Sequence, residues 1–302
     1  MPFSFRQSMF ARFACLLTGV ILLLGSGLTA SAQDALPLPT PLKPMHTLYW
    51  SPPAVTYGAD EIDFLINIIF GLTAFVFFAV NTMFIYYMVK YRRKPGVKAY
   101  YSHGNNTLEI LWTTTPTIVF LSLAIYGNNL WKNLFSQAPE NSIPIEIVGF
   151  QFAWDIRYPG ADGVLGRADD ERVTPDNKLG IDWEDPAAKD DFTSTELVIP
   201  VGRPVHLYLR SRDVIHSFYV PVFRLYQDTL PGRTIDWVWF ECHTAGEFEI
   251  ACSQLCGQGH YNMKARIRVV PLEEYEAWYA EKVKQTAEAQ EKASSGVAQA
   301  QP

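Results

Sequence analysis

The fold is decided first by residues 62–89, which read IDFLINIIFGLTAFVFFAVNTMFIYYMV. Asp63, close to the start of this run, is its only charged residue. The run is longer than the roughly 20 apolar residues that a helix needs to cross a bilayer. Because apolar side chains occupy every face, we favour a membrane span over the core helix of a soluble protein.

A basic loop and a second apolar run follow this span, over 90–107 and 108–130. The basic residues of the loop are Lys90, Arg92, Arg93, Lys94 and Lys98. Clusters of Lys and Arg mark the cytoplasmic side of a membrane protein, and tryptophans such as Trp112 and Trp131 gather at its interfaces. We therefore expect a two-helix transmembrane hairpin over 62–131, with the loop in the cytoplasm and the rest of the mature chain on the other side.

Glu109 lies where the second span begins on the cytoplasmic side, three residues before Trp112. A carboxylate in the first turn of a helix is favoured by the helix dipole, which is the simpler interpretation. Ionisable groups at membrane entrances also gather protons, so a role in proton uptake is the second interpretation.

The N-terminus is typical of a secretory signal peptide over 1–32. Arginines precede a short apolar run over 13–24, and the small residues Ala30-Ser31-Ala32 fit a cleavage site. Cleavage would leave a periplasmic segment over 33–61. It would remove two arginines and no acidic residue, so the net charge would change from −6 to −8. An exported acidic chain is a poor ligand for nucleic acid.

Residues 139–271 consist of short apolar runs separated by Pro and Gly. Apolar and polar residues alternate clearly over 205–209 and 248–250. Several such runs with turn residues between them predict an all-β sandwich or barrel. The runs that we expect to form strands are 143–158, 196–211, 216–223, 235–243, 246–252 and 264–270.

Two further segments differ from these runs. Residues 161–191 hold ten Asp or Glu against four Lys or Arg, and we interpret them as an inserted, solvated loop. The final segment 272–302 is expected to begin as an amphipathic helix over 272–293 and to end in a disordered tail, SSGVAQAQP.

The stretch ACSQLCGQGHYNM, residues 251–263, holds Cys252, Cys256, His260 and Met263. A disulfide, a zinc site and a copper site are all conceivable. A disulfide would leave the histidine and methionine without a role, and structural zinc has little use for a thioether. Copper at an electron-transfer site takes thiolate and imidazole ligands with a long axial Met, so the donor set favours copper.

His216, in RDVIHSFYVP, is the candidate upstream ligand because it lies between two apolar runs. With it, two copper ions could share two bridging thiolates, and each ion would have its own imidazole. The Met263 sulfur would then bind one ion, and the backbone carbonyl of Gln254 the other. Cys242 lies outside this pattern, and we interpret it as a buried free thiol.

These residues resemble the motifs of subunit II of cytochrome c oxidase, which carries the dinuclear copper centre called CuA. The family pattern Cys-x3-Cys-x3-His-x2-Met is met by Cys252, Cys256, His260 and Met263. Two further family motifs are met by Asp213-Val214-Ile215-His216-Ser217 and by Pro231-Gly232-Arg233. The hairpin, its basic loop and the β-domain also agree, so the resemblance covers nearly the whole mature chain.

The resemblance implies a cupredoxin-like sandwich on a transmembrane hairpin in a bacterial inner membrane, with the β-domain in the periplasm. It implies association with the haem-bearing subunit I and other oxidase subunits. Electrons would pass from cytochrome c, or another c-type donor, through CuA to haem a, while subunit I reduces dioxygen to water and pumps protons. It also implies proton uptake at Glu109, because the family's glutamate lies three residues before the tryptophan of the second helix.

Two positions depart from the family pattern. The family usually has Glu between the cysteines, with a side chain that helps to hold magnesium, but here the residue is Gln254. A neutral amide is a weaker ligand for a hard cation, which puts magnesium in doubt. The tryptophan that usually receives the electron aligns with Phe152, which leaves Trp154 as the nearest indole.

The acidic insertion 161–191 exceeds the family minimum and is a candidate part of a docking face for the donor.

Other functions fit the sequence less well. Subunit II of a quinol oxidase typically lacks the copper ligands, so the full set argues against it. A membrane-anchored copper carrier would bind one labile copper and show no mixed-valence spectrum. Nitrous oxide reductase also uses CuA, but this chain has no room for its large catalytic domain.

Overall fold

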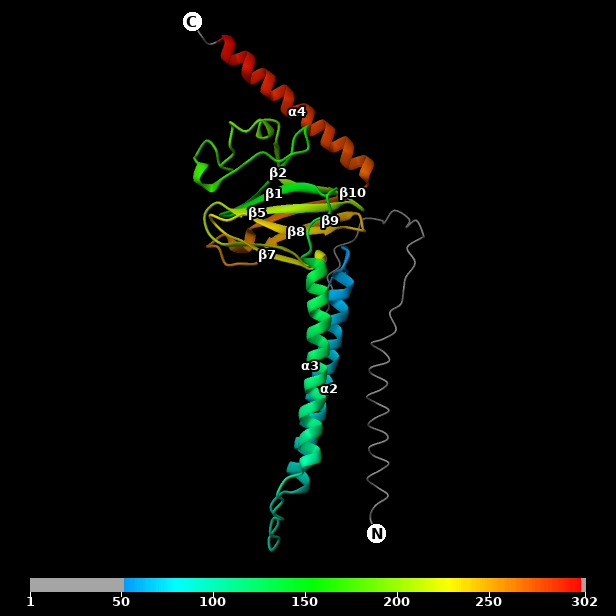
Figure 1. Ribbon diagram of the computed structural model, residues 1–302. Helices are drawn as coiled ribbons and strands as arrows, with labels where there is room; N and C mark the ends of the chain where they lie inside the picture. Colours follow the sequence, from blue (N-terminus) through cyan, green and yellow to red (C-terminus); the bar gives the residue numbers. More distant parts are fainter. Residues whose placement is uncertain (1–51, 300–302) are drawn as a thin grey trace. The chain divides into compact units, whose positions relative to one another are not determined.

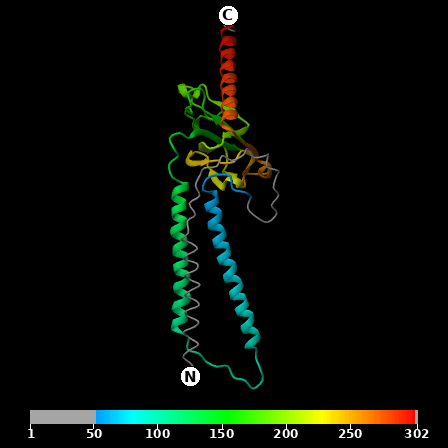
Figure 2. The same cartoon turned by 90° about the vertical axis from the view of Figure 1, so that its right-hand side faces the viewer.

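The computed structural model describes residues 52–299. The predicted signal peptide over 1–32 and most of the segment 33–61 lie outside the described residues, so both stay predictions. Within the described part, two long helices, a β-domain and a C-terminal helix follow one another along the chain (Figures 1 and 2).

The two long helices are α2 (Ala59–Lys90) and α3 (Asn106–Leu134). Their mean hydropathies of 2.2 and 1.5, and their lengths, are sufficient to cross a membrane. Asn105 caps α3, since its side chain accepts a hydrogen bond from the Leu108 N–H at 3.2 Å. Both predicted spans are thus confirmed as apolar helices.

The β-domain is a sandwich of two five-stranded sheets, with the strand orders β3-β2-β1-β5-β8 and β4-β10-β9-β6-β7. Its strands are β1 (Ile143–Phe150), β2 (Ala153–Tyr158), β3 (Phe192–Ser194), β4 (Glu196–Pro200), β5 (Pro204–Ser211), β6 (His216–Val220), β7 (Leu225–Thr229), β8 (Ile235–Glu241), β9 (Gly246–Cys252) and β10 (Lys264–Val270). Short 3-10 helices lie between them: η1 (Asp170–Arg172), η2 (Pro186–Ala188), η3 (Pro221–Phe223) and η4 (His260–Asn262). The pairs β1–β5 and β4–β10 are parallel, and the other pairs are antiparallel. The predicted all-β sandwich is confirmed.

The core of the sandwich is built from side chains that alternate along the strands. In β5, Val205, Leu207 and Leu209 point inward and are buried, as the two-residue period of a strand requires. Phe218 of β6 and Ile250 of β9 meet them from the other sheet and are fully buried. Such close packing provides a rigid base for the loops at the strand ends.

The segment that precedes α2 covers part of the β-domain. Thr56 forms a β-bridge with Cys242, and the His243 N–H donates a hydrogen bond to the Val55 carbonyl at 3.0 Å. Val55 and Cys242 are both buried, and the Cys242 thiol is free. The prediction of a buried free thiol is confirmed.

Two of the predicted strands each divide in two. The run 143–158 turns back after Phe150, so that β1 and β2 pair antiparallel. The run 196–211 breaks at Gly202, whose φ of +72° lies in the left-handed region that favours glycine. Strands β3 and β7 are absent from the predicted runs because they are short and contain several polar residues.

Residues 161–191 are not a simple solvated loop, which corrects the expectation from their charge. Leu179, Ile181 and Ala188 form a small apolar cluster with Val148 of β1. These side chains are irregularly spaced along the insertion, so no periodic pattern predicts that it packs against the sheet.

The C-terminal helix α4 spans Leu272–Gln299 and is longer than predicted. Near its start, Trp278 makes an edge contact with Tyr158 of β2 at 5.2 Å between ring centroids. The helix extends beyond the predicted 272–293, and the disordered tail stays a prediction.

Candidate metal centre

The candidate site lies where β6, β9 and the loop after β9 meet. His216 is the first residue of β6 and Cys252 is the last residue of β9. The two strands are antiparallel neighbours, so these ends lie at the same edge of the sheet. Cys256 lies in the following loop, His260 begins η4, and Met263 directly precedes β10. Three segments of the chain therefore supply the candidate ligands.

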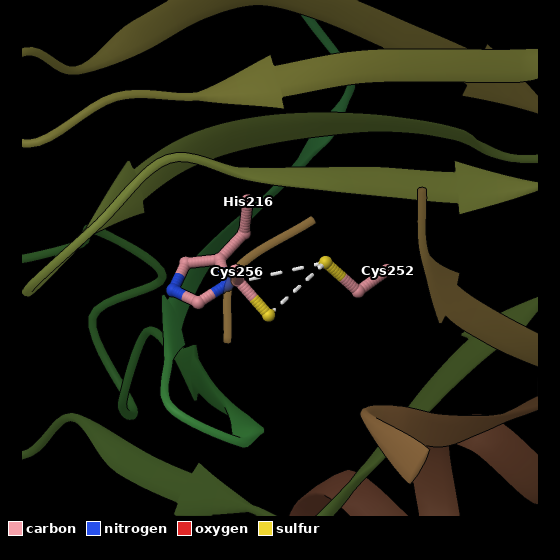
Figure 3. A group of neighbouring side chains, drawn as sticks. All are labelled: His216, Cys252 and Cys256. Carbon is pink, nitrogen blue, oxygen red and sulfur yellow. Dashed lines mark hydrogen bonds between the residues drawn. The ribbon is translucent and has the colours of Figure 1, made fainter. Parts of the chain in front are cut away.

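The two cysteine sulfurs form the centre of the site. They lie 3.9 Å apart, well beyond the roughly 2 Å of a disulfide bond, and both thiols are free. Nδ1 of His216 is 3.9 Å from the Cys252 sulfur, and Nδ1 of His260 is 3.7 Å from the Cys256 sulfur. Figure 3 shows the His216 ring and both sulfurs directed toward one another. Each sulfur thus has its own imidazole nitrogen.

Two weaker donors complete the set, one near each sulfur. The Met263 thioether is buried, and its Sδ lies 3.7 Å from the Cys256 sulfur. The Gln254 carbonyl oxygen lies 3.2 Å from the Cys252 sulfur. The six predicted donors are therefore close together in the structure.

Asp213 orients the His216 ring. Its Oδ1 lies 2.8 Å from Nε2 of His216, which places the ring proton on Nε2 and leaves the Nδ1 lone pair facing the sulfur. Burial alone would raise the pKa of Asp213, but hydrogen bonds from the Gln151 N–H, the His216 ring and the Val214 N–H outweigh it and lower the pKa. A carboxylate held in its charged form is a strong acceptor for the ring N–H.

Gln151 is a site residue that the sequence did not indicate. Its N–H donates to Oδ2 of Asp213 at 2.8 Å, and its side-chain amide donates to the Cys256 carbonyl at 2.5 Å. Gln151 therefore connects Asp213, which orients the candidate ligand His216, to the loop that carries the candidate ligand Cys256. Asp213 has a local signal, since it precedes His216 by three residues, but Gln151 is distant in sequence and has none.

Phe152 and Trp154 occupy different environments. The Trp154 ring is 4% exposed and meets the His216 ring edge-on at 6.0 Å between centroids. Phe152 is 38% exposed, and its ring lies so close to Gly257 and Gly259 that a β-carbon at either position would collide with it. Phe152 is thus a surface residue of the β1–β2 turn that packs against the loop of the candidate ligands, whereas Trp154 is an interior neighbour of the candidate ligand His216.

The remaining predicted site residue, Glu109, lies in the first turn of α3, away from this cluster. Its carboxylate lies against Gly104, where a β-carbon would be 3.0 Å from Oε1. Cys242 also lies apart from the cluster, and burial raises the pKa of its thiol far above the usual value.

The donor set fits a pair of copper ions. Burial raises the pKa of Cys256 to about 11, and the neighbouring Cys252 sulfur adds to this, so a cation is needed to keep the Cys256 sulfur as a thiolate. A single zinc ion would use four Cys and His donors and leave the adjacent thioether and carbonyl without a partner. Thiolate, imidazole and thioether donors together are typical of copper in electron transfer.

Two family profiles match this chain. The profile for the periplasmic domain of cytochrome c oxidase subunit II matches residues 143–270. The profile for the transmembrane domain of the same subunit matches residues 46–130.

Individual proteins are also similar to this chain. The alternative cytochrome c oxidase subunit 2 of Bradyrhizobium diazoefficiens is 36% identical over 232 residues, which cover 76% of this chain and 82% of the relative. Cytochrome c oxidase subunit 2 of Cereibacter sphaeroides is 30% identical over 273 residues, which cover 86% and 88%. The solved periplasmic domain of subunit II of cytochrome oxidase from Bradyrhizobium japonicum is 30% identical, with a TM-score of 0.37, and covers 50% of this chain and 99% of that one. The two profiles and the two relatives show that this chain belongs to the cytochrome c oxidase subunit II family.

Proposed function

We propose that this chain is the electron-accepting subunit of a cytochrome c oxidase and holds a dinuclear copper centre, CuA. Bound there, the copper pair would take up and release one electron at a time. Electrons would come from cytochrome c or another c-type donor and continue to haem a in subunit I, where dioxygen is reduced to water and protons are pumped. The chain would lie in a bacterial inner membrane after removal of its signal peptide, with the β-domain in the periplasm.

The convergence of the six donors is the observation that carries this proposal. The sulfurs of Cys252 and Cys256 lie 3.9 Å apart and would be the ligands shared by two ions, and each sulfur has a separate imidazole on its own side. Met263 adds a thioether beside one sulfur and Gln254 a carbonyl beside the other. Ligands fixed by packed strands and by Asp213 need little rearrangement when the charge of the site changes.

Copper analysis of the purified oxidase tests the proposal. We expect two copper ions per chain at this site and the spectrum of a mixed-valence pair. Cys252→Ser and Cys256→Ser should each abolish that spectrum, because a hydroxyl does not replace a bridging thiolate. Cys242→Ser is the matched control, since this thiol is buried elsewhere and should leave the spectrum unchanged.

Two results would contradict the proposal. Retention of the mixed-valence spectrum in the Cys252→Ser variant would rule out this ligand set. One labile copper per chain without that spectrum would instead favour a protein that carries copper.

Electron and proton uptake are assigned to separate parts of the chain. Phe152 is exposed in the turn between β1 and β2 and packs against the loop that carries Cys256 and His260, so we assign the contact with the donor to it, and Trp154 lies beside His216. We assign proton uptake to Glu109 at the start of α3. The acidic insertion 161–191 contributes negative charge that favours a basic donor.

No magnesium ligand is assigned. The Gln254 side chain is exposed and offers a neutral amide where a carboxylate would suit a hard cation. Within residues 52–299, the one cluster of three His, Cys, Asp or Glu donors is His216 with Cys252 and Cys256.

A further inference from the structure

A buried ionic network joins the acidic insertion to the sheet that carries β1, β2 and β5. Glu146 of β1 lies between two arginines and accepts a hydrogen bond from Nε of Arg157 at 2.6 Å and from Nε of Arg210 at 2.7 Å. All three side chains are almost completely buried. The outer ends of both arginines reach the insertion, where they meet Asp191 and Asp170.

Asp170 is the member of this network that also reaches another part of the domain. Its Oδ1 accepts a hydrogen bond from Nη1 of Arg210 at 2.6 Å. Its Oδ2 accepts one from the Gly232 N–H at 2.8 Å. One carboxylate of the insertion therefore holds two segments that are distant from it in sequence.

The first of these segments leads directly to the metal centre. Arg210 lies near the end of β5, and Asp213 follows three residues later and holds Nε2 of His216. Between them, the Arg212 N–H donates to the Gly149 carbonyl at 3.0 Å, and a β-carbon at Gly149 would lie only 3.0 Å from the His216 ring. A shift at the end of β5 would therefore move the support of this ligand.

The second segment is the turn Pro231–Arg233 between β7 and β8. Gly232 has a φ of +73°, and its N–H points to Asp170 rather than into a strand ladder. The turn meets the end of β5 through a bridge between Ser211 and Pro231. Asp170 thus fixes both partners of this bridge, one through Arg210 and the other through Gly232.

We propose that Asp170 is a positioning residue for the metal centre and that the insertion clamps the end of β5 to the Pro231–Arg233 turn. The inference goes beyond the donor-docking role of the insertion and depends on interior contacts rather than on its exposed charges. It rests on the proposed copper centre only for the spectroscopic test, because hydrogen exchange of the clamped segments can be measured without a metal.

Hydrogen exchange on the purified full-length complex provides the first test. In Asp170→Ala, a peptide that covers 230–236 should exchange about tenfold faster, because the Gly232 N–H loses a charged, shielded acceptor. Asp170→Asn keeps a neutral acceptor of the same size and should show a smaller change in the same direction. Asp176→Asn is the control, since Asp176 is an exposed acidic residue of the same insertion without such contacts.

The copper spectrum and midpoint potential provide the second test. Both should shift in Asp170→Ala and stay unchanged in Asp176→Asn, although neither residue is a ligand. Faster exchange with an unchanged spectrum and potential would show that the clamp does not affect the metal centre, which contradicts the positioning role. Unchanged exchange would show that Asp170 does not clamp the two segments. Absence of the copper pair from the wild-type complex would contradict the proposed function and leave the exchange result interpretable.

Discussion

At the scale of single residues, the two weaker donors differ in how they depend on side-chain identity. Gln254 approaches Cys252 through its backbone carbonyl, so a residue with any side chain at this position could make that contact. Met263 approaches Cys256 through its side chain and is buried. Substitution can therefore remove the thioether alone.

Met263→Leu is expected to leave copper bound and to shift the midpoint potential. Leucine has a similar volume and preserves the packing, while axial ligands tune a copper site more than they hold the metal. Copper content and redox titration of the purified complex would check this. Complete loss of copper would show that Met263 holds the metal.

Phe152→Leu is expected to slow reduction by a cytochrome donor roughly tenfold, as loss of an interface hot spot does. Because the ring is exposed and is not a donor to the metal centre, the copper spectrum and reduction by a small chemical reductant should change little. Stopped-flow reduction with both reductants separates these effects. An unchanged rate with the protein donor would remove Phe152 from the electron-uptake surface.

Trp154→Phe is the matched variant for this experiment. The Trp154 N–H has no hydrogen-bond partner among the described residues, so phenylalanine loses no hydrogen bond there. Its ring packs on His216, so we expect this change to alter the copper spectrum rather than the docking of the donor.

At the scale of elements, the sequence predicts the helices and most strands because each has a strong periodic or continuous apolar pattern. The ligand motifs also indicate six candidate donors that lie together in the structure, since five of them fall within residues 252–263. The turn at Phe150 and the packing of Leu179 on Val148 depend on contacts between distant segments, which no local pattern reports. Gln151 and Asp170 were missed for the same reason.

Helix α3 places Glu109 in its first turn, and Glu109→Gln is expected to slow turnover at least about tenfold. An amide cannot carry the proton, yet it keeps the size of the side chain. Glu61→Gln in the first turn of α2 is the control. Oxygen consumption and the copper spectrum should be measured together, and full activity in Glu109→Gln would exclude the proton-uptake role.

The insertion carries a pH-sensitive carboxylate. Burial raises the pKa of Asp191 from 3.8 to about 6, although the Arg157 guanidinium and the Gly166 N–H act against it. The network holds three carboxylates against two guanidinium groups, and Oδ1 of Asp191 has no partner within the described residues. A surplus buried carboxylate is expected to bind a proton more readily than usual.

The stability that Asp191 contributes to the insertion should therefore be fully present below about pH 4 and be lost as the pH rises through about 6. The pKa of the folded state lies above that of the unfolded chain, so ionisation in this window favours unfolding. Hydrogen exchange over 161–191, corrected for intrinsic rates, would report this trend. Asp191→Asn should remove it and Asp176→Asn should retain it. The same trend in both variants would assign the effect to another group.

At the scale of the whole molecule, one arginine joins the start of α2 to the β-domain. Arg224 donates through Nε and Nη2 to the Asp63 carboxylate, at 2.7 Å each, and through Nη2 to the Pro52 carbonyl. Its φ of 55° is unusual for a residue other than glycine. Arg224 therefore forms a half-buried ion pair with Asp63 and also holds the segment that covers Cys242.

Arg224→Ala is expected to destabilise the β-domain by about 2 kcal/mol, because Asp63 would lose two charged hydrogen bonds. Lys264→Ala is the control, since its ion pair with Glu249 is 50% and 59% exposed and should contribute about 0.5 kcal/mol or less. Thermal unfolding of the purified complex would compare the two. Equal effects would show that the Arg224 contacts add nothing beyond a surface ion pair.

The cover that Val55 and Thr56 provide also affects how the β-domain should be produced as a recombinant fragment. A gene segment that starts after α3 would omit both residues and expose the sulfur of Cys242 to air and to neighbouring molecules. Such a fragment would be liable to covalent dimers that are absent from the intact chain. Cys242→Ser, or a linker that restores 52–58, would prevent this artefact.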